Sequence, residues 1–140
     1  MVERSVCVQF PEVAGFGDNS IGYNCFKGVK ALADALATHN TLEELNLISN
    51  CISIDEAKAF ADALITNTTL KKLYLGNDCF FGDEGAKVFS DALATNNTLK
   101  LLHLDRTSIP VEGAASLVRA LPTNNTLEEL NFWSQNRKYG

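Results

Sequence analysis

Long apolar runs and an excess of positive charge are both missing from this sequence of 140 residues. No stretch approaches the roughly 20 apolar residues that a membrane-spanning helix needs, which argues against a membrane protein. The net charge of −5 argues against nucleic acid or an anionic membrane surface as the main partner. Residues 1–20 lack the continuous apolar core of a secretory signal, so we expect a cytoplasmic protein.

Signatures of metal, nucleotide and cofactor chemistry are also missing. The cysteines form no Cys-x-x-Cys pair, and neither His39 nor His103 has zinc-ligand spacing to them. We find no P-loop and no Gly-x-Gly-x-x-Gly motif. The sequence therefore predicts a protein with no cofactor, no metal site and no catalytic centre, whose thiols are reduced. The cysteines are Cys7, Cys25, Cys51 and Cys79.

What the sequence does contain is an internal repeat. An Asn-Thr-Leu or Thr-Thr-Leu phrase opens four segments, and their first leucines lie 28, 29 and 28 residues apart. Each segment continues with the spacing Leu-x-x-Leu-x-Leu, except that a phenylalanine, Phe132, closes the last one. Alternation with period two predicts a short strand with one buried face. The first leucines are Leu42, Leu70, Leu99 and Leu127.

After each predicted strand the apolar residues change to helical spacing. Ala57, Phe60, Ala61 and Leu64 lie at i, i+3, i+4 and i+7, as one face of a helix requires. A capping box of Ser53 with Glu56 would begin this helix. The same offsets recur at Val29, Leu32, Ala33 and Leu36; at Ala86, Phe89, Ser90 and Leu93; and at Ala114, Leu117, Val118 and Leu121.

Each unit is thus a strand, a turn, a helix and a loop, and it cannot bury its apolar stripe alone. Stacked units would form an α/β solenoid with a parallel sheet on the concave face and helices on the convex face. We expect one domain over 1–140, with repeats at about 42–69, 70–98 and 99–126 and a partial repeat at 127–140. The difference in width between the helix and strand layers would curve the stack.

The pattern Leu-x-x-Leu-x-Leu-x-x-Asn-x-Ile, present around Asn50-Cys51-Ile52, resembles the leucine-rich repeats of ribonuclease inhibitor. It is also similar to repeats of Ran GTPase-activating proteins and of nucleotide-binding innate immune receptors. Gly85-Ala86 and Gly113-Ala114 match the helix start of those repeats. The resemblance covers about residues 14–133 and implies a right-handed horseshoe arc, whereas function does not follow from the scaffold. Departures from the family are Glu56 at the glycine position and Asp78, Thr107 and Gln135 at the asparagine position.

The two ends fit the repeat poorly. Residues 1–27 are irregular, and we prefer a degenerate first strand within residues 14–21, with Asn19 and Ile21 in register. The alternating residues Val6, Val8 and Phe10 offer a capping strand instead. At the other end, no helical pattern follows the last strand. A solenoid needs polar caps, so this end indicates either a truncated chain or a homodimer through the uncapped end.

Residues that flank the strand leucines should point away from the core, onto the concave face. Neighbouring strands lie about 4.8 Å apart, so equivalent residues would form closely spaced columns. Tyr74, His103 and Trp133 would supply an aromatic row for a partner. His103 and Asp105 also suggest an acid–base pair, but no nucleophile motif accompanies them. The predicted partner-binding residues are Asn46, Ile48, Lys72, Tyr74, Leu101, His103, Asp105, Asn131 and Trp133.

Two further regularities are interpreted as structural. Lysine and aspartate recur at i and i+4 on three predicted helices and indicate a solvated outer face. Asn-x-Ser/Thr phrases begin at Asn67, Asn96 and Asn124 because asparagine and threonine satisfy backbone groups in the loop before each strand. Glycosylation is not expected at these phrases. The lysine–aspartate pairs are Lys30 with Asp34, Lys58 with Asp62 and Lys87 with Asp91.

The sequence therefore favours a module that binds a protein partner through the concave face. One alternative is a regulatory protein of the GTPase-activating type, for which Arg106, just beyond a strand, is the available arginine. Another alternative is a fragment of a larger receptor of the innate-immune type. The adjacent Cys51 and Cys79 are expected to be free thiols, with a disulfide as the alternative.

Overall fold

The computed structural model describes residues 5–7, 21–38, 41–48, 52–75 and 81–132, with side chains from residue 30 onward. Five strands and four α-helices alternate along these residues. None of the described helices is long and apolar enough to cross a membrane. The elements are β1 (Ser5–Cys7), α1 (Ile21–Thr38), β2 (Glu44–Asn46), α2 (Ile54–Thr66), β3 (Lys72–Tyr74), α3 (Gly82–Thr95), β4 (Leu101–His103), α4 (Val111–Ala120), the 3-10 turn η1 (Leu121–Thr123) and β5 (Glu129–Asn131).

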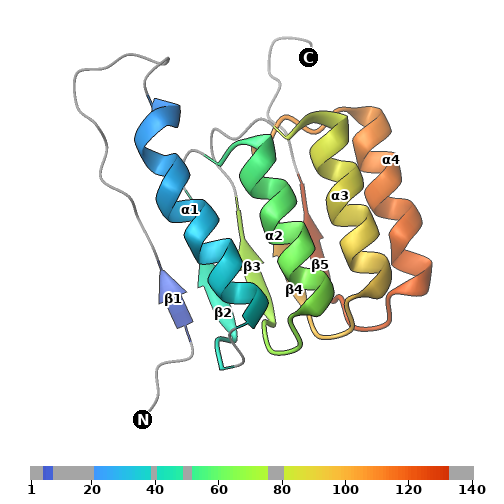
Figure 1. Ribbon diagram of the computed structural model, residues 1–140. Coiled ribbons are helices and arrows are strands. Elements are labelled where there is room, and N and C mark those ends of the chain that lie inside the picture. Colours follow the sequence, from blue (N-terminus) through green and yellow to red (C-terminus); the bar gives the residue numbers. More distant parts are fainter. Residues whose placement is uncertain (1–4, 8–20, 39–40, 49–51, 76–80, 133–140) are drawn as a thin grey trace.

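All five strands form one parallel sheet in the order of the chain. The helices lie side by side in a second layer along one face of this sheet (Figure 1). The strands pair in register at the repeat spacing, so that Leu45, Leu73, Leu102 and Leu130 are consecutive partners. The repeated βα unit predicted from the sequence is therefore confirmed as a mixed α/β arrangement.

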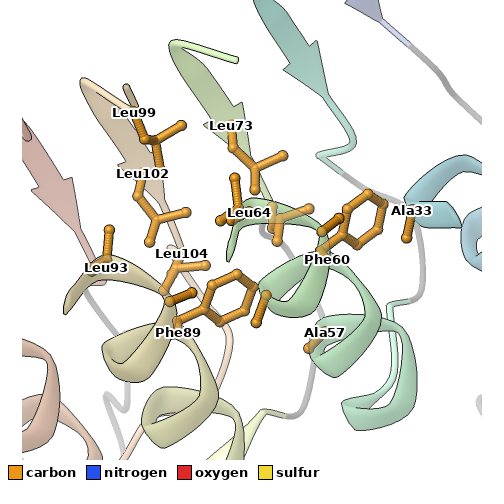
Figure 2. Packing of buried hydrophobic residues seen from close by; sticks show 14 of the residues in the cluster. Ala33, Ala57, Phe60, Leu64, Leu73, Phe89, Leu93, Leu99, Leu102 and Leu104 are labelled. Atoms are coloured by element: carbon orange, nitrogen blue, oxygen red, sulfur yellow. The ribbon is translucent and has the colours of Figure 1, made fainter. Parts of the chain in front are cut away.

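A single apolar core lies between the two layers, as Figure 2 shows. The strand leucines of the second and third repeats are fully buried, and so are Phe60 and Phe89 of the facing helices. The rings of Phe81 and Phe89 pack with their centroids 5.8 Å apart. Because α2 and α3 each contribute the face predicted at i, i+3, i+4 and i+7, consecutive units share one core.

The last unit departs from this pattern. Val118 is 51% exposed and Leu121 is 36% exposed, although both occupy helix positions that the sequence predicts to be apolar and inward. The equivalent Ala61 and Leu93 are buried. The difference has a simple cause, since α2 and α3 are each covered by a following helix, whereas no further described helix follows α4.

At the other end, the strand beside β2 is Ser5–Cys7, with Val6 aligned to Leu45. The first described strand thus contains Val6 of the capping-strand alternative. Ile21 begins helix α1 rather than following a strand. Residues 14–20 lie outside the described residues. Without the repeat's leucines, the sequence contained no signal that distinguished the two segments.

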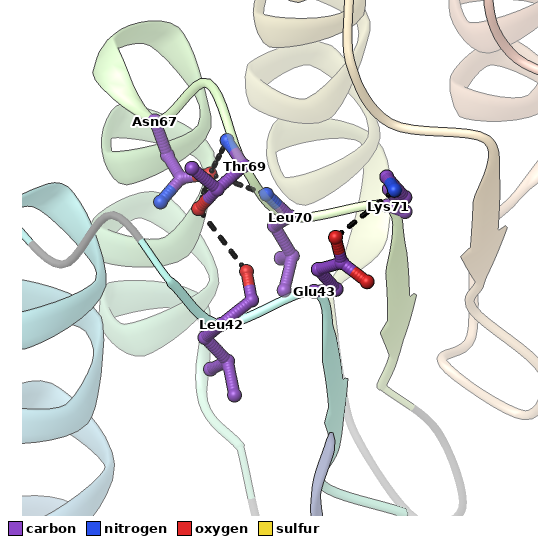
Figure 3. Close-up of polar contacts among 6 residues, drawn as sticks. All are labelled: Leu42, Glu43, Asn67, Thr69, Leu70 and Lys71. Atoms are coloured by element: carbon purple, nitrogen blue, oxygen red, sulfur yellow. Dashed lines mark hydrogen bonds and ion pairs between the residues drawn. The ribbon is translucent and has the colours of Figure 1, made fainter. Parts of the chain in front are cut away.

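The loop before each strand is held by an asparagine that bridges two units. The amide nitrogen of Asn96 donates to the carbonyl of Leu64 at 2.8 Å, and its side-chain oxygen accepts from the backbone of Thr98 and Leu99 at 3.0 and 2.8 Å. Asn67 and Asn124 make equivalent bonds. Figure 3 shows the Asn67 loop, where Thr69 also donates to the Leu42 carbonyl at 3.1 Å. The structural interpretation of the Asn-x-Ser/Thr phrases is confirmed.

The predicted pairing of Ser53 with Glu56 begins α2. A carboxylate oxygen of Glu56 accepts from the backbone N–H of Ser53 at 2.9 Å and from its hydroxyl. Glu56 is 1% exposed, and its other carboxylate oxygen has no partner within the described structure. Burial raises the pKa of this carboxyl above its usual value. The equivalent Gly85 and Gly113 leave no room for a side chain, so Glu56 is an exception among the three units.

The predicted lysine–aspartate pairs form only in part. Lys30 and Asp34 lie 3.3 Å apart as expected. Lys58 instead pairs with Glu84 of the next helix, and this ion pair raises the pKa of the exposed lysine. Neither Lys58 with Asp62 nor Lys87 with Asp91 is an ion pair in the described structure. A helix packed alongside offers a carboxylate that spacing within one helix could not reveal.

Candidate protein-binding surface

The face of the sheet opposite the helices carries the residues that flank the strand leucines. We call this surface the open face and define it by the two columns that the strand register sets. The register confirms that each column consists of consecutive neighbours. The first column is Glu44, Lys72, Leu101 and Glu129, and the second is Asn46, Tyr74, His103 and Asn131.

An aromatic and charged cluster lies at the middle of the second column. The rings of Tyr74 and His103 meet edge to face, with centroids 5.7 Å apart and an angle of 75° between their planes. His103 Nε2 lies 2.5 Å from a carboxylate oxygen of Asp105. The His103 and Asp105 side chains keep 25% and 29% exposure. The three side chains therefore hold one another in place and still present polar edges to solvent.

This arrangement is typical of a contact surface. Aromatic side chains supply large contact areas at a low cost in conformational entropy, which makes them frequent anchors at interfaces. Packing against Tyr74 and pairing with Asp105 restrict the His103 ring. Less ordering is then required on binding. The imidazole of His103 can also act as a hydrogen-bond donor or acceptor, depending on which ring nitrogen carries a proton.

Charged side chains surround this cluster in a pattern that the sequence analysis did not identify. Glu43 pairs with Lys71 at 3.0 Å, and Lys100 pairs with Glu128 at 3.7 Å. These four residues each come one position before a member of the first column, and we call them the charged row: Glu43, Lys71, Lys100 and Glu128. Within the first column itself, Lys72 lies 3.7 Å from Glu44. The lysines thus gather on β3 and at the start of β4, with glutamates on both sides.

The signal for this pattern was present at the repeat spacing. Glu43-Glu44, Lys71-Lys72, Lys100-Leu101 and Glu128-Glu129 occupy the same two positions of successive units. Because parallel strands in register bring equivalent residues together, reading both positions across the units predicts the ion pairs. Exposed pairs of this kind contribute about 0–1 kcal/mol each to stability.

The remaining predicted residues differ in their surroundings. The side-chain oxygen of Asn46 accepts from the backbone N–H of Ile48 at 3.0 Å, so this side chain turns toward its own loop. Ile48, Leu101 and Asn131 are half-buried, whereas Lys72 is exposed. Trp133, the third member of the predicted aromatic row, lies outside the described residues, as do Cys51 and Cys79. The structure thus brings Tyr74, His103 and Asp105 together.

Comparison with known proteins identifies the repeat. A family model described as a leucine-rich repeat matches residues 66–90, which span the end of α2, β3 and most of α3. Residues 66–90 thus match a leucine-rich repeat. No curated protein matches the chain.

Solved structures support the leucine-rich repeat fold over a larger part of the chain. Actin-binding site 2 of leiomodin-1 is similar at 20% identity with a TM-score of 0.66, covering 79% of this chain and 64% of that chain. The tropomodulin C-terminal domain from Caenorhabditis elegans is similar at 17% identity with a TM-score of 0.68, covering 79% and 67%. The chain spans slightly less than two thirds of the leiomodin-1 structure. Likeness at these identities shows the fold alone, and the ribonuclease-inhibitor type stays a prediction.

Proposed function

We propose that this leucine-rich repeat chain is a protein-binding module, not an enzyme, and that its partner contacts the open face. The observation that carries the proposal is the cluster of Tyr74, His103 and Asp105, which is ordered by its own contacts and partly exposed. In a solenoid of the ribonuclease-inhibitor type this face would be concave and could surround part of a partner.

The charged row suggests what such a partner would present. Lys71, Lys72 and Lys100 lie on or just before β3 and β4, the strands that carry Tyr74 and His103, and their glutamate partners lie on or just before β2 and β5. A partner with a central acidic group and flanking basic groups would complement this order of charges. A partner with the opposite order of charges would be repelled. The similar part of leiomodin-1 is an actin-binding site of that protein. Actin is therefore the first defined partner to test.

Binding constants for variants of the two faces test the proposal. Monomeric actin and any partner isolated by cross-linking in cells would be purified and titrated against the wild-type chain, Tyr74→Ala and His103→Ala. We expect each substitution to weaken binding about tenfold or more, as for a central interface residue. Asp62→Ala and Lys87→Ala change exposed residues of α2 and α3 and serve as matched controls. Loss of binding in the controls alone would place the contact on the helices and contradict the proposal.

A further inference from the structure

The contact between His103 and Asp105 on the open face fixes where the histidine ring carries its proton. Nε2 of His103 lies 2.5 Å from a carboxylate oxygen of Asp105. An ionised carboxylate only accepts hydrogen bonds, so Nε2 is the donor and holds a proton in both charge states of the ring. The ring therefore gains or loses its second proton at Nδ1. Asp105 is a positioning residue in this pair.

Nδ1 of His103 is the ring nitrogen that solvent can reach. It makes no hydrogen bond within the described residues. In that part of the chain, the only buried side-chain nitrogen or oxygen without a partner is Oε1 of Glu56, so Nδ1 is not buried. The edge-to-face contact with Tyr74 holds the ring from the β3 side. The open face thus offers Nδ1 as an acceptor when the ring is neutral and as a donor when the ring is charged.

Charges of both signs lie around this ring on β4 and on the two strands that pair with it. With a neutral ring, His103 and Asp105 together carry one negative charge, and with an imidazolium they carry none. Protonation at Nδ1 therefore removes a net negative charge from the middle of the second column. The titratable and charged residues on these three strands and in the loop after β4 are Lys72, Tyr74, Asp105, Arg106 and Glu129.

The acidic group of the proposed partner gives this titration a consequence, so the inference rests on the proposed function. An ionised acidic group only accepts hydrogen bonds, and it can bond Nδ1 only when Nδ1 carries a proton. We propose that the partner's acidic group binds His103 as the imidazolium, so that binding to the open face takes up one proton at Nδ1. Histidine changes its charge between about pH 5 and pH 8. Binding is therefore strongest at the low end of this range and weakens as the pH rises.

Nuclear magnetic resonance of the free chain tests the position of the proton without any partner. In long-range proton–nitrogen spectra, we expect the neutral His103 ring to hold its proton on Nε2 and Nδ1 to be protonated as the pH is lowered. Asp105→Asn replaces the carboxylate by an amide, which can donate as well as accept, so this variant should show both neutral forms of the ring. A neutral wild-type ring with its proton on Nδ1, or the same mixture of forms in both proteins, would overturn the assignment.

Titration of the chain with monomeric actin at several pH values tests the effect on binding. We expect the dissociation constant of the wild type to rise about tenfold or more from about pH 6 to about pH 8. His103→Gln has an amide that can donate at every pH, so its dissociation constant should change by less than about threefold over this range. His39→Gln changes the other histidine of the chain and is the matched control, which should keep the pH dependence of the wild type.

Calorimetry in two buffers with different heats of ionisation measures the proton itself. At the same pH, the wild type should take up more protons per bound actin than His103→Gln does, and any titration of actin is common to both. Far-UV circular dichroism would confirm that the variants fold. Equal pH dependence and equal proton uptake in the wild type and His103→Gln would overturn this inference and leave the proposed function standing. No binding of actin at any pH would overturn both proposals for this partner.

Discussion

At the scale of single residues, the inter-unit asparagines show how a repeat sequence holds its loops. Asn96 is 5% exposed and bonds backbone groups of two units at once, whereas its neighbour Asn97 is exposed in the same loop. Removing the Asn96 side chain takes its hydrogen bonds away from the carbonyls of Leu64 and Asn67 and from the N–H groups of Thr98 and Leu99. The two neighbouring asparagines therefore have very different roles.

Asn96→Ala is expected to lower the free energy of unfolding by about 2–4 kcal/mol, because several buried polar groups lose their hydrogen bonds. Asn97→Ala is the matched control and should change it by less than about 0.5 kcal/mol. Urea unfolding followed by circular dichroism measures both. Equal effects of the two substitutions would show that the bridging bonds do not stabilise the loop.

Glu56 predicts a pH dependence. Burial raises the pKa of its carboxyl in the folded chain. A pKa that is higher in the folded than in the unfolded chain stabilises the fold most below the unfolded value, and this contribution is lost as the pH rises through the folded value. Glu56→Gln keeps an oxygen for the Ser53 N–H but cannot ionise. Its stability relative to the wild type should therefore increase from about pH 4 to about pH 7.

Unfolding curves of the wild type and Glu56→Gln over this pH range measure the difference. Asp62→Asn removes one negative charge from the same helix at an exposed position and serves as the control. A constant difference in stability between Glu56→Gln and the wild type would contradict a raised pKa at Glu56.

At the scale of elements, the distance between adjacent helices depends on glycine at the helix contact. A Cβ atom at Gly113 of α4 would lie 2.8 Å from the Cβ of Ala86 in α3 and 2.9 Å from a methyl group of Ile109. Such contacts are shorter than van der Waals separation, so α3 and α4 would have to move apart. Glycine at this position therefore permits the close approach of the helices.

Gly113→Ala should lower the free energy of unfolding by about 1–3 kcal/mol through this overpacking. The effect opposes the intrinsic helix preference of alanine, which would favour the substitution by about 1 kcal/mol. Glu112→Ala, an exposed change in the same turn of α4, is the control and should have little effect. Thermal or urea unfolding distinguishes the two, and a more stable Gly113→Ala variant would contradict the close packing.

The elements were also what the sequence predicted best. Four leucine-led strands and the helices between them follow from two periods of apolar residues, because each period depends only on local geometry. Contacts between units were harder to predict. Lys58 pairs with Glu84 of the next helix, not with Asp62 of its own, and only the packed structure brings Glu84 close. For the same reason, the sequence placed Tyr74 and His103 in one row without predicting that their rings meet.

At the scale of the whole molecule, burial decreases toward the last unit. Leu102 is fully buried between the sheet and the helices, whereas Leu130 holds the same position of the next unit and is half-buried. The sequence predicted the same environment for both, since the motif is the same. Leu102 is covered by the next unit, whereas no described unit covers Leu130. No local sequence pattern encodes this difference.

Leu102→Ala should therefore cost more stability than Leu130→Ala, although both shorten the same residue of the motif. We expect about 3–5 kcal/mol for Leu102→Ala and less than half of that for Leu130→Ala. Unfolding at low chain concentration measures the difference within a monomer. Equal costs would mean that the last unit is as well covered as the interior ones.

The central claim is that the units share one core and leave the open face for a protein partner. Nuclear magnetic resonance of the chain, titrated with a captured and purified partner, tests this claim most directly. We predict that the largest chemical shift changes fall on the side chains of Tyr74 and His103 and on the neighbouring residues of β3 and β4. Changes concentrated on the outer sides of α1–α3, with the resonances of Tyr74 and His103 unmoved, would contradict the account.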